Sequence, residues 1–285
     1  MIAASLILSW FFVGLWMGLM RARGWGKRIR PEGPPEHQLK AGTPSMGGVA
    51  FFLAGWLIYL LARHQLGPLW ILGLGFALLG LIDDLGGLWN RPLKAREKLA
   101  IQVFLALIFG VWAVLHAGLP ATPWEVLLIV LAIVGSANAF NFTDGADGLL
   151  TTLTLILLLP FQGLATAQSL LGSLLGFLWY NAPPARVFMG DVGSQALGAM
   201  TAGIFILEGK IWYLPLAALI PVLEILSVIL QVVYFQRTGK RLLRMSPLHH
   251  HFELSGWEES KIVFRFGIVT AFTTALALSL WGGRL

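Results

Sequence analysis

The sequence predicts an all-α, polytopic integral membrane protein with about ten transmembrane helices, and three observations support this class. Of its 285 residues, 57% are hydrophobic and only 12% are charged, whereas a soluble domain contains about 25% charged residues. Apolar runs of roughly 14 to 22 residues recur along the whole chain, and a helix needs about 20 residues to cross a bilayer. The runs lack the alternation of barrel strands, so helices remain as the way to pair backbone groups in lipid.

The first five expected spans are separated by polar segments. The first run has no preceding basic region and no small-residue cleavage site, so we expect a retained span rather than a signal peptide. The second follows a glycine-rich turn, the third ends at two aspartates, the fourth follows Lys98, and the fifth ends in a stretch rich in Asn and Asp. These spans are expected at 2–20, 47–62, 69–82, 99–116 and 124–140.

The other five expected spans complete the chain. The sixth follows the stretch rich in Asn and Asp, the eighth opens with a Gly-Asp-Val-Gly sequence, and the ninth leads into the largest polar loop. Several of the ten runs are short, so tilt of the helices or a locally thin bilayer is required. The five are expected at 148–166, 168–181, 195–208, 212–236 and 262–281.

The distribution of basic residues predicts the orientation. Ten spans place both termini on the same side of the membrane. Of the 20 Lys and Arg residues, the even-numbered connections and the C-terminus contain only Arg63, Lys210 and Arg284. The positive-inside rule therefore places the odd-numbered connections in the cytoplasm and both termini on the non-cytoplasmic side. The net charge of +6 follows from this topology, and we expect no nucleic acid as a partner.

The chain is expected to form a single transmembrane domain over residues 1–285. We find no linker, internal repeat or low-complexity segment in the sequence. Because cysteine is absent, disulfides, thiol nucleophiles and Cys-ligated metals are excluded. The polar loops expected to build an active site are 21–46, 83–98, 138–148, 182–195 and 237–261.

The aspartates are expected on the same side of the membrane as most of the basic residues. All five, Asp83, Asp84, Asp144, Asp147 and Asp191, lie at the expected cytoplasmic ends of spans. Asn138, Asn141, Asn181, Ser194 and a triplet of histidines lie at that face too. Ionisable groups in or near a membrane mark functional sites by default. The sequence therefore predicts one cytoplasmic site.

Two acidic motifs are candidates for binding a metal ion and phosphate. Asp83 and Asp84 are adjacent, and adjacent helical residues point about 100° apart, so we expect different partners for the two. The alternative is a solvated helix end with Lys94 or Arg96 as counter-ions. Asp191 lies near a helix N-terminus, which favours an anion there; its alternative is an ordinary N-cap.

The stretch from Asn138 to Gly148 combines Asn, Thr and Asp side chains with glycines. Asn and Asp oxygens are suitable ligands for hard cations and suitable partners for a base or ribose. Glycines allow the backbone to turn tightly and to approach a ligand closely. The alternative is an Asx-turn with helix capping.

Three further elements are candidates for binding phosphate. The triplet His249-His250-His251 cannot converge on one metal ion from a regular helix, so phosphate or hydroxyl contacts suit it better than zinc; its alternative is a solvated loop. The turn Gly42–Gly48 lacks the ending of a P-loop but follows Lys40. Lys98 could bind phosphate or simply extend toward the interface.

Together these residues provide acids for Mg²⁺, cations for phosphate and a polar loop for a head group, as phosphoryl transfer requires. The motifs are TPSMGG (43–48), the pair at 83–84, NAFNFTDGADGL (138–149), FMGDVGS (188–194) and PLHHHFE (247–253). In this order they resemble the phospho-N-acetylmuramoyl-pentapeptide-transferases, of the polyprenyl-phosphate N-acetylhexosamine-1-phosphate transferase superfamily. The resemblance covers about residues 37 to 266.

The resemblance implies the transfer of phospho-MurNAc-pentapeptide from UDP-MurNAc-pentapeptide to undecaprenyl phosphate, giving lipid I and UMP, with Mg²⁺ as cofactor. It also implies the bacterial cytoplasmic membrane and a possible homodimer. Asp191 would be the principal Mg²⁺ ligand, with Asn141 beside it, and Asp83 would be the base. The implied catalytic residues are Asp83, Asp84, Lys98, Asp191, His249, His250 and His251.

The resemblance also implies a substrate-binding set. Asp147, Asn181, Phe188 and the Gly145 backbone would form a uridine pocket near Lys40. The full implied set is Lys40, Thr43, Ser45, Asn138, Asp144, Gly145, Asp147, Asn181, Phe188 and Ser194.

The chain departs from the family pattern in three places, and two other functions are compatible with parts of it. The lysine that often follows the Asp pair closely is missing, the family's NLTDGLDGLA appears as NFTDGADGLL, and Gln195 replaces a smaller or apolar residue. A GlcNAc-1-phosphate transferase would carry a shorter His-x-His motif in place of HHHFE. A transporter would need inverted repeats and acids at the membrane midplane, whereas these acids lie at one face.

Overall fold

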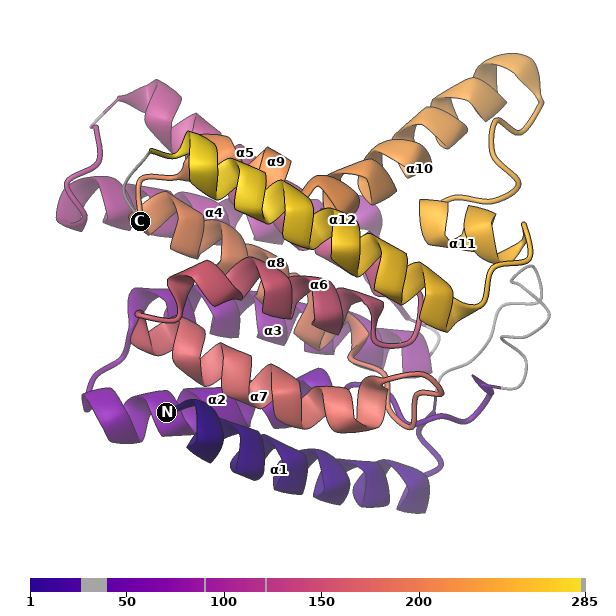
Figure 1. Ribbon diagram of the computed structural model, residues 1–285, viewed down its shortest axis with the longest axis horizontal. Helices are drawn as coiled ribbons and strands as arrows, with labels where there is room; N and C mark the ends of the chain where they lie inside the picture. Colours follow the sequence, from indigo (N-terminus) through magenta and orange to yellow (C-terminus); the bar gives the residue numbers. More distant parts are fainter. Residues whose placement is uncertain (27–39, 90, 121, 283–285) are drawn as a thin grey trace.

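A computed structural model describes residues 1–26, 40–89, 91–120 and 122–282, and nearly all of its regular secondary structure is helical. In the described residues the only extended pairing is an isolated bridge between Gly26 and Pro44. Figure 1 shows the order of the helices. They are α1 (Ile2–Ala22), α2 (Gly48–Arg63), α3 (Pro68–Leu88), α4 (Ala95–His116), α5 (Pro123–Thr143), α6 (Leu149–Leu158), α7 (Ala165–Asn181), α8 (Gly190–Leu207), α9 (Leu214–Ala217), α10 (Leu219–Thr238), α11 (Leu248–Glu253) and α12 (Glu259–Leu280).

Six of these helices are long and apolar enough to cross a membrane: α1, α3, α4, α5, α10 and α12. The shorter helices α2 and α6, the latter extended by a 3₁₀ turn to Phe161, are apolar as well. The all-helical, polytopic class predicted from the sequence is thereby confirmed. The number of ten spans and the orientation of the termini stay predictions.

Several boundaries differ from those expected. The expected span 212–236 is wrong as one helix, because a 3₁₀ turn and α9 precede α10 and the backbone turns at Ala218. Pro215 and Pro221, which lack an amide hydrogen, flank that turn. In the other direction, α3 continues six residues beyond the expected end at residue 82, so the Asp pair lies on a helix. The loop 237–261 contains the short helix α11.

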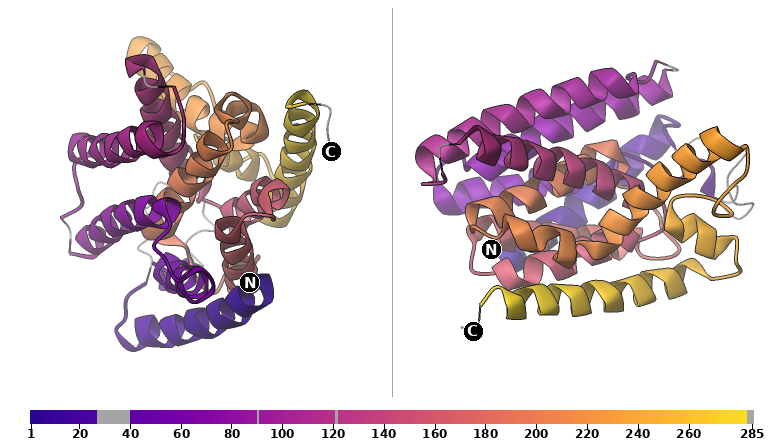
Figure 2. Two further views of the ribbon diagram at one scale, coloured as in Figure 1. Left: turned by 90° about the vertical axis from the view of Figure 1, so that its left-hand side faces the viewer. Right: turned by 90° about the horizontal axis from the view of Figure 1, so that it is seen from above.

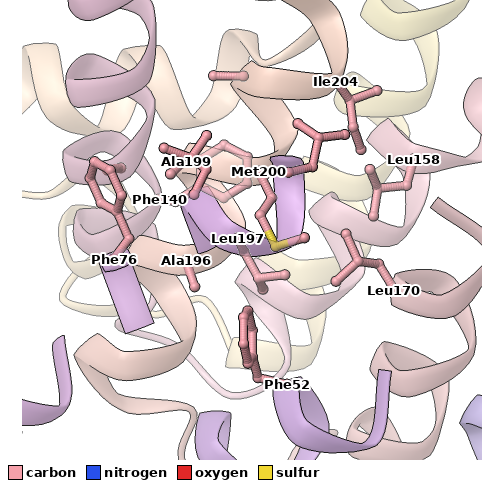
Figure 3. Packing of buried hydrophobic residues seen from close by; sticks show 14 of the residues in the cluster. Phe52, Phe76, Phe140, Leu158, Leu170, Ala196, Leu197, Ala199, Met200 and Ile204 are labelled. Carbon is pink, nitrogen blue, oxygen red and sulfur yellow. The ribbon is translucent and has the colours of Figure 1, made fainter. Parts of the chain in front are cut away.

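Helix α8 is the centre of the bundle, and nearly all its residues from Val192 to Ile206 are buried. Figure 3 shows its Leu197 and Met200 among Phe52 of α2, Phe140 of α5 and other apolar side chains. Small residues bring the helix backbones close together, as is common in membrane bundles. A Cβ atom added at Gly80 of α3 would lie 2.3 Å from the Asp191 carbonyl oxygen, so α3 packs directly on the start of α8.

The helices run roughly along one axis, with α1 and α12 at the outer edges (Figure 2). Helix α1 begins and α12 ends at the same end of the bundle, and α11 lies at the opposite end (Figure 1). The second half of α10 leaves the bundle there, since its buried residues stop at Ser227. At this end α3, α5 and α7 finish and α4, α8 and α12 start, so their terminal polar residues meet.

Candidate active site

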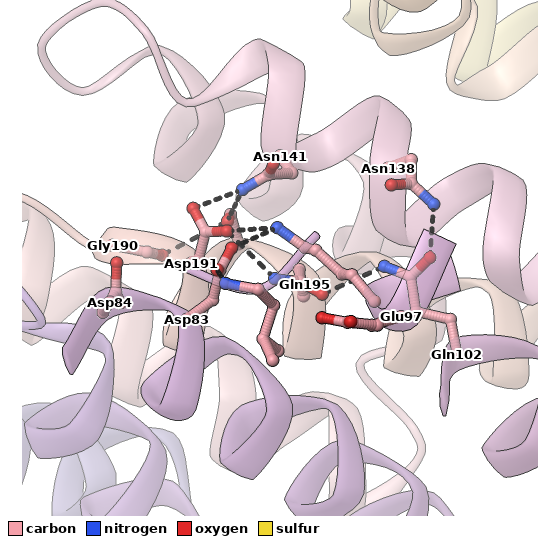
Figure 4. Close-up of polar contacts among 12 residues, drawn as sticks. Asp83, Asp84, Glu97, Gln102, Asn138, Asn141, Gly190, Asp191 and Gln195 are labelled. Carbon is pink, nitrogen blue, oxygen red and sulfur yellow. Dashed lines mark hydrogen bonds and ion pairs between the residues drawn. The ribbon is translucent and has the colours of Figure 1, made fainter. Parts of the chain in front are cut away.

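Lys98, at the start of α4, bridges two of the candidate aspartates. Its Nζ donates to Asp83 Oδ2 at 3.0 Å and to Asp191 Oδ2. The exposed fraction of these three side chains is 15%, 16% and 27%, so the charges are partly shielded from water. We call Asp83, Asp84, Lys98, Asn141 and Asp191 the acid–lysine cluster (Figure 4). With its carboxylates ionised, the cluster has more negative than positive charge.

The two adjacent aspartates have different partners, as expected from their helical geometry. Asp83 Oδ1 accepts a hydrogen bond of 2.9 Å from the Leu93 amide. Asp84 Oδ2 accepts one of 3.1 Å from the Val192 amide, in the first turn of α8. Gly190 lies beside this contact at φ +75°, where a Cβ atom would be 2.6 Å from Asp84 Oδ2. A side chain at position 190 would therefore separate α3 from α8.

Helix α5 supplies the amide that orients the other oxygen of Asp191. Asn141 Nδ2 donates to Asp191 Oδ1 at 2.8 Å and to Ser194 Oγ at 3.0 Å, and Ser194 Oγ donates to the Gly190 carbonyl at 3.2 Å. Asn138, one turn earlier, donates instead to Gln102 Oε1 and to the Val134 carbonyl, both at 2.8 Å. Of the two candidate asparagines, only Asn141 contacts Asp191 directly.

A second polar group forms around Lys40. Its Nζ donates to Asp147 Oδ1 at 2.7 Å and to Glu259 Oε1 at 2.5 Å. Burial of Lys40 acts to lower the pKa of its ammonium group, but the hydrogen bonds and charges of Asp147 and Glu259 outweigh it and raise this pKa above its usual value. Asp147 is buried, and its Oδ2 accepts a 2.8 Å hydrogen bond from the Ala185 amide. We call Lys40, Asp147 and Glu259 the Lys40 cluster.

Backbone contacts fix the segment 43–48 beside the start of α8. The Phe188 amide donates to the Pro44 carbonyl and the Gly47 amide to the Phe188 carbonyl, both at 2.9 Å. The Thr43 amide donates to the Lys40 carbonyl at 3.1 Å, and Trp16 Nε1 donates to the Ser45 carbonyl at 3.0 Å. The side chains of Thr43 and Ser45 are half-buried. This segment therefore joins Lys40 to Phe188.

Asn181 is buried at the end of α7, where it closes the loop that leads to α8. Its Oδ1 accepts a hydrogen bond of 2.7 Å from Thr151 Oγ1, and its Nδ2 donates to the Val187 carbonyl at 3.0 Å. The Asn181 amide thus connects α6 to the backbone of Val187, the residue before Phe188. The geometry supports a positioning role for Asn181 in the loop, beside the contact with uridine that the resemblance implies.

The three histidines lie on α11 and have different partners. His249 is fully buried, and its Nδ1 lies 3.2 Å from Glu224 Oε2 of α10. His250 Nδ1 lies 2.7 Å from Glu253 Oε2, and His251 Nδ1 accepts a hydrogen bond from the Arg244 amide at 3.2 Å. The rings of His249 and His250 lie in contact, with centroids 4.1 Å apart, but the three side chains have separate partners.

The loop after α5 passes directly over His249. A Cβ atom at Gly145 would lie 2.1 Å from His249 Nε2, so this position must be glycine for the loop and α11 to pack. Asp144, half-buried, is the C-cap of α5 immediately before it. The segment 141–147 thus runs from the acid–lysine cluster past α11 to the Lys40 cluster. The five aspartates do not form one group: three lie in the first cluster and Asp147 lies in the second.

The acid–lysine cluster suits Mg²⁺ by its donor atoms and its negative charge. Mg²⁺ uses one or two carboxylates and completes its shell with water and phosphate oxygens. The described residues hold no group of three or more His, Asp or Glu side chains arranged as a metal site. Asp191, together with the Asn141 amide oxygen, could provide the one or two protein ligands.

Comparison with known proteins decides the family. The profile of Glycosyl transferase family 4 matches residues 67–209, and signature 1 of the phospho-N-acetylmuramoyl-pentapeptide-transferases matches residues 40–52. Proteins named phospho-N-acetylmuramoyl-pentapeptide-transferase from Deinococcus radiodurans and Deinococcus deserti are 43% and 46% identical over the whole of both chains. One from Moorella thermoacetica is 45% identical over 88% of both chains. The chain belongs to the phospho-N-acetylmuramoyl-pentapeptide-transferase family. The resemblance seen in the sequence is confirmed, and the protein is a bacterial membrane enzyme.

The matched regions cover most of the site in this family member. The signature contains Lys40 and the segment 43–48, and the longer match contains the acid–lysine cluster, the loop after α5, Asn181 and Phe188. The histidine triplet lies outside both, but the relatives that match the whole chain cover it. The match to Glycosyl transferase family 4 therefore contains the whole of segment 141–147, which connects the two clusters.

Four residues of the site were missed by reasoning from the sequence: Glu259, Glu224, Gln102 and, as a contact of Asp191, Gln195. Gln102 follows Lys98 by four residues and Gln195 follows Asp191 by four, so each pair lies on one helix face. That spacing was a usable signal. Glu224 and Glu259 gave none, because their partners are 25 and 219 residues away.

An apolar groove of about 490 Å³ lies between α6 and α12. Thr152, Ile156, Phe264 and Ile268 are among its lining residues. None of the residues of the acid–lysine cluster lines it. The groove holds no group able to carry out phosphoryl transfer.

Proposed function

We propose that the chain transfers phospho-MurNAc-pentapeptide from UDP-MurNAc-pentapeptide to undecaprenyl phosphate, giving lipid I and UMP. The observation that carries the proposal is the bridge by Lys98 between Asp83 and Asp191, in a chain 43% identical over its full length to a named transferase. Such a group of fixed charges matches phosphoryl transfer, which depends mainly on positioning and charge neutralisation.

A lipid acceptor is supported by the surroundings of the acid–lysine cluster. Ile82 and Leu99, the neighbours of Asp83 and Lys98, are 56% and 50% exposed. Apolar residues exposed on membrane-spanning helices face lipid. A phosphate head group on a polyprenyl chain can therefore reach the cluster while its chain stays in the bilayer.

The donor is expected on the side of the Lys40 cluster. Asp147 and the Gly145 backbone provide acceptors and donors for uridine, and Phe188 provides an aromatic face. The backbone contacts of segment 43–48 hold Lys40 and Phe188 in one unit. The diphosphate would then extend along segment 141–147, past Asp144 and the histidines, toward Lys98.

In the proposed reaction, an oxygen of the lipid phosphate attacks the β-phosphorus of the donor; the bond from that phosphorus to the oxygen bridging to the α-phosphorus breaks, and UMP leaves. Asp191 and Asn141 would hold Mg²⁺, which when bound neutralises charge on the diphosphate. Lys98 places its positive charge between Asp83 and Asp191, where both phosphate groups must approach each other. A phosphate monoester is already mostly dianionic at pH 7, since its second pKa is near 6, so we assign Asp83 to positioning Lys98 rather than to removing a proton.

We further propose ten spans, both termini outside, and an active site facing the cytoplasm of the bacterial inner membrane. The excess of basic residues in the odd-numbered connections supports this orientation. The meeting of the polar helix ends on one side of the bundle supports it as well. A homodimer, implied by the family, would be detected by the mass of the purified protein in detergent.

The deciding experiment measures UMP release by the purified chain from UDP-MurNAc-pentapeptide, with and without undecaprenyl phosphate and Mg²⁺. Release that requires both supports direct transfer. Release of one equivalent without the lipid would indicate a covalent phospho-enzyme. Transfer from UDP-GlcNAc instead would establish the other branch of the superfamily, and no transfer from either donor would refute the proposal.

A further inference from the structure

A line of three side-chain amides runs through the bundle and ends on Asp191. Asn138 Nδ2 of α5 donates to Gln102 Oε1 of α4 at 2.8 Å, and Gln102 Nε2 donates to Gln195 Oε1 of α8 at 3.0 Å. Gln195 Nε2 then donates to Asp191 Oδ2 at 3.1 Å. Figure 4 shows the line crossing from Asn138 to the acid–lysine cluster. We call Asn138, Gln102 and Gln195 the amide relay.

The amide relay has a fixed direction. Asn138 uses one hydrogen of its NH₂ group for the Val134 carbonyl and the other for Gln102. Because Gln102 accepts at its oxygen, it must present its NH₂ group to Gln195, and Gln195 must in turn present its NH₂ group to Asp191. A reversed Gln195 would place its oxygen against Asp191 Oδ2 and its NH₂ group against that of Gln102. The helical carbonyl of Val134 therefore determines that a donor faces the aspartate.

Burial makes the amide relay costly unless each member is bonded. Gln102 is 1% exposed and Gln195 is 0% exposed, and a buried polar group without a partner is strongly unfavourable. Leucine at either position would fill similar space without that requirement. The glutamines provide Asp191 with an uncharged N–H donor. Hydrogen bonds among α4, α5 and α8 fix the position of this donor.

The contacts of Asp191 divide between its two oxygens. Oδ1 accepts from Asn141, and Oδ2 accepts from Lys98 and Gln195. Lys98 has a long flexible side chain that also contacts Asp83, and any phosphate in the site would compete for it. The contact from Gln195 comes from the next turn of α8 and does not depend on the charge of the substrate.

We propose that Gln102 and Gln195 are positioning residues for the transfer reaction: they hold the carboxylate of Asp191 in one orientation when Lys98 turns to phosphate. The inference rests on the proposed function for its reaction, but the contact that it assigns can be tested without turnover. The two glutamines act only through Asp191 and do not bind the donor. Their replacement is therefore expected to lower the rate of the chemical step rather than the affinity for the donor.

The test compares Gln195→Leu and Gln102→Glu with a control, Thr201→Val. Thr201 is a buried polar residue of the same helix, outside the amide relay. Gln195→Leu is expected to lower kcat for UMP release about 10- to 100-fold, the usual effect of removing a residue that orients a ligand, with KM for the nucleotide donor nearly unchanged. Gln102→Glu keeps the size but presents an oxygen to Gln195, which reverses it, so kcat should fall similarly. Thr201→Val should keep the wild-type kcat.

A second measurement separates positioning from structural support. The unfolding temperatures of Gln195→Leu, Asp191→Asn and the double variant form a cycle that requires no activity. Non-additive changes are expected, because the two side chains share a hydrogen bond. Additive changes, or normal kcat in folded Gln195→Leu, would overturn the proposal, as would equal losses of kcat in Thr201→Val. If the wild-type chain released no UMP, the proposed function would fail while the cycle would still test the contact.

Discussion

Replacing Asp191 by asparagine tests the centre of the site most directly. Both oxygens of Asp191 accept hydrogen bonds, and all three donors are nitrogens: those of Lys98, Asn141 and Gln195. An asparagine has the same shape, but in either orientation its NH₂ group faces one of these donors. A buried donor left unsatisfied costs about 1–3 kcal/mol, and removing one partner of a buried ion pair costs about 3–5 kcal/mol.

Asp191 is 27% exposed and therefore mostly shielded from water, so we take about 4 kcal/mol, the middle of the range for a buried ion pair. If that interaction is needed mainly in the transition state, kcat should fall about 10³-fold, because each 1.36 kcal/mol corresponds to a factor of ten. Glu208→Gln is the matched control, since Glu208 is exposed at the other end of α8.

The assay is UMP release at saturating donor, lipid phosphate and Mg²⁺, with the unfolding temperature measured to show that each variant is folded. The control should retain the wild-type kcat. A folded Asp191→Asn enzyme with a kcat within threefold of wild type would show that Asp191 lies outside the reaction, and the mechanism proposed above would be wrong.

The remaining predictions concern the two lysines, one glycine and the metal ion. Lys98→Met should reduce kcat about 10²- to 10³-fold, as the removal of one stabilising donor does. An unchanged kcat would contradict the proposal that Lys98 lies between the two phosphate groups. Lys40→Met should raise KM for the nucleotide donor more than it lowers kcat, because Lys40 orders the buried Asp147 on the donor side; the reverse split would exclude this role. Gly145→Ala should lower the unfolding temperature and activity together, since its Cβ atom would overlap His249, whereas Gly163→Ala, where a Cβ atom meets nothing within 4 Å, should change neither. Removal of divalent ions with EDTA should abolish UMP release and Mg²⁺ should restore it; activity that survives chelation would refute a Mg²⁺-dependent mechanism.

The sequence was sufficient to predict helices and their polar ends, because continuous apolar runs in lipid leave few other structures. Breaks within a run were harder to predict. The turn at Ala218 interrupts a sequence that is apolar on both sides, and the extension of α3 past Asp84 depends on contacts with α8 that hydropathy does not report. Composition describes what faces lipid, whereas these details are set by packing between helices.

The sequence predicted that the candidate residues lie at the ends of spans, but it did not predict their partners. Position at one end of a span identified Lys40, Lys98 and the five aspartates, since charged groups in a bilayer are costly without a function. The pairing of Lys98 with Asp191 spans 93 residues and that of Lys40 with Glu259 spans 219, and periodicity carries no information at such separations. The division into two clusters therefore became visible only in the structure.

The two clusters are linked by one short segment of the chain, and this link sets their separation. In each cluster one lysine bridges two carboxylates, so each lysine charge has counter-ions and each of these carboxylates has a cationic partner. Segment 141–147 belongs to both, with Asn141 on Asp191 and Asp147 on Lys40. Because that segment is short and Gly145 is packed against His249, the distance between the clusters is fixed by the backbone. If the proposed function is correct, this fixed separation would match a donor with uridine at one end and phosphate at the other.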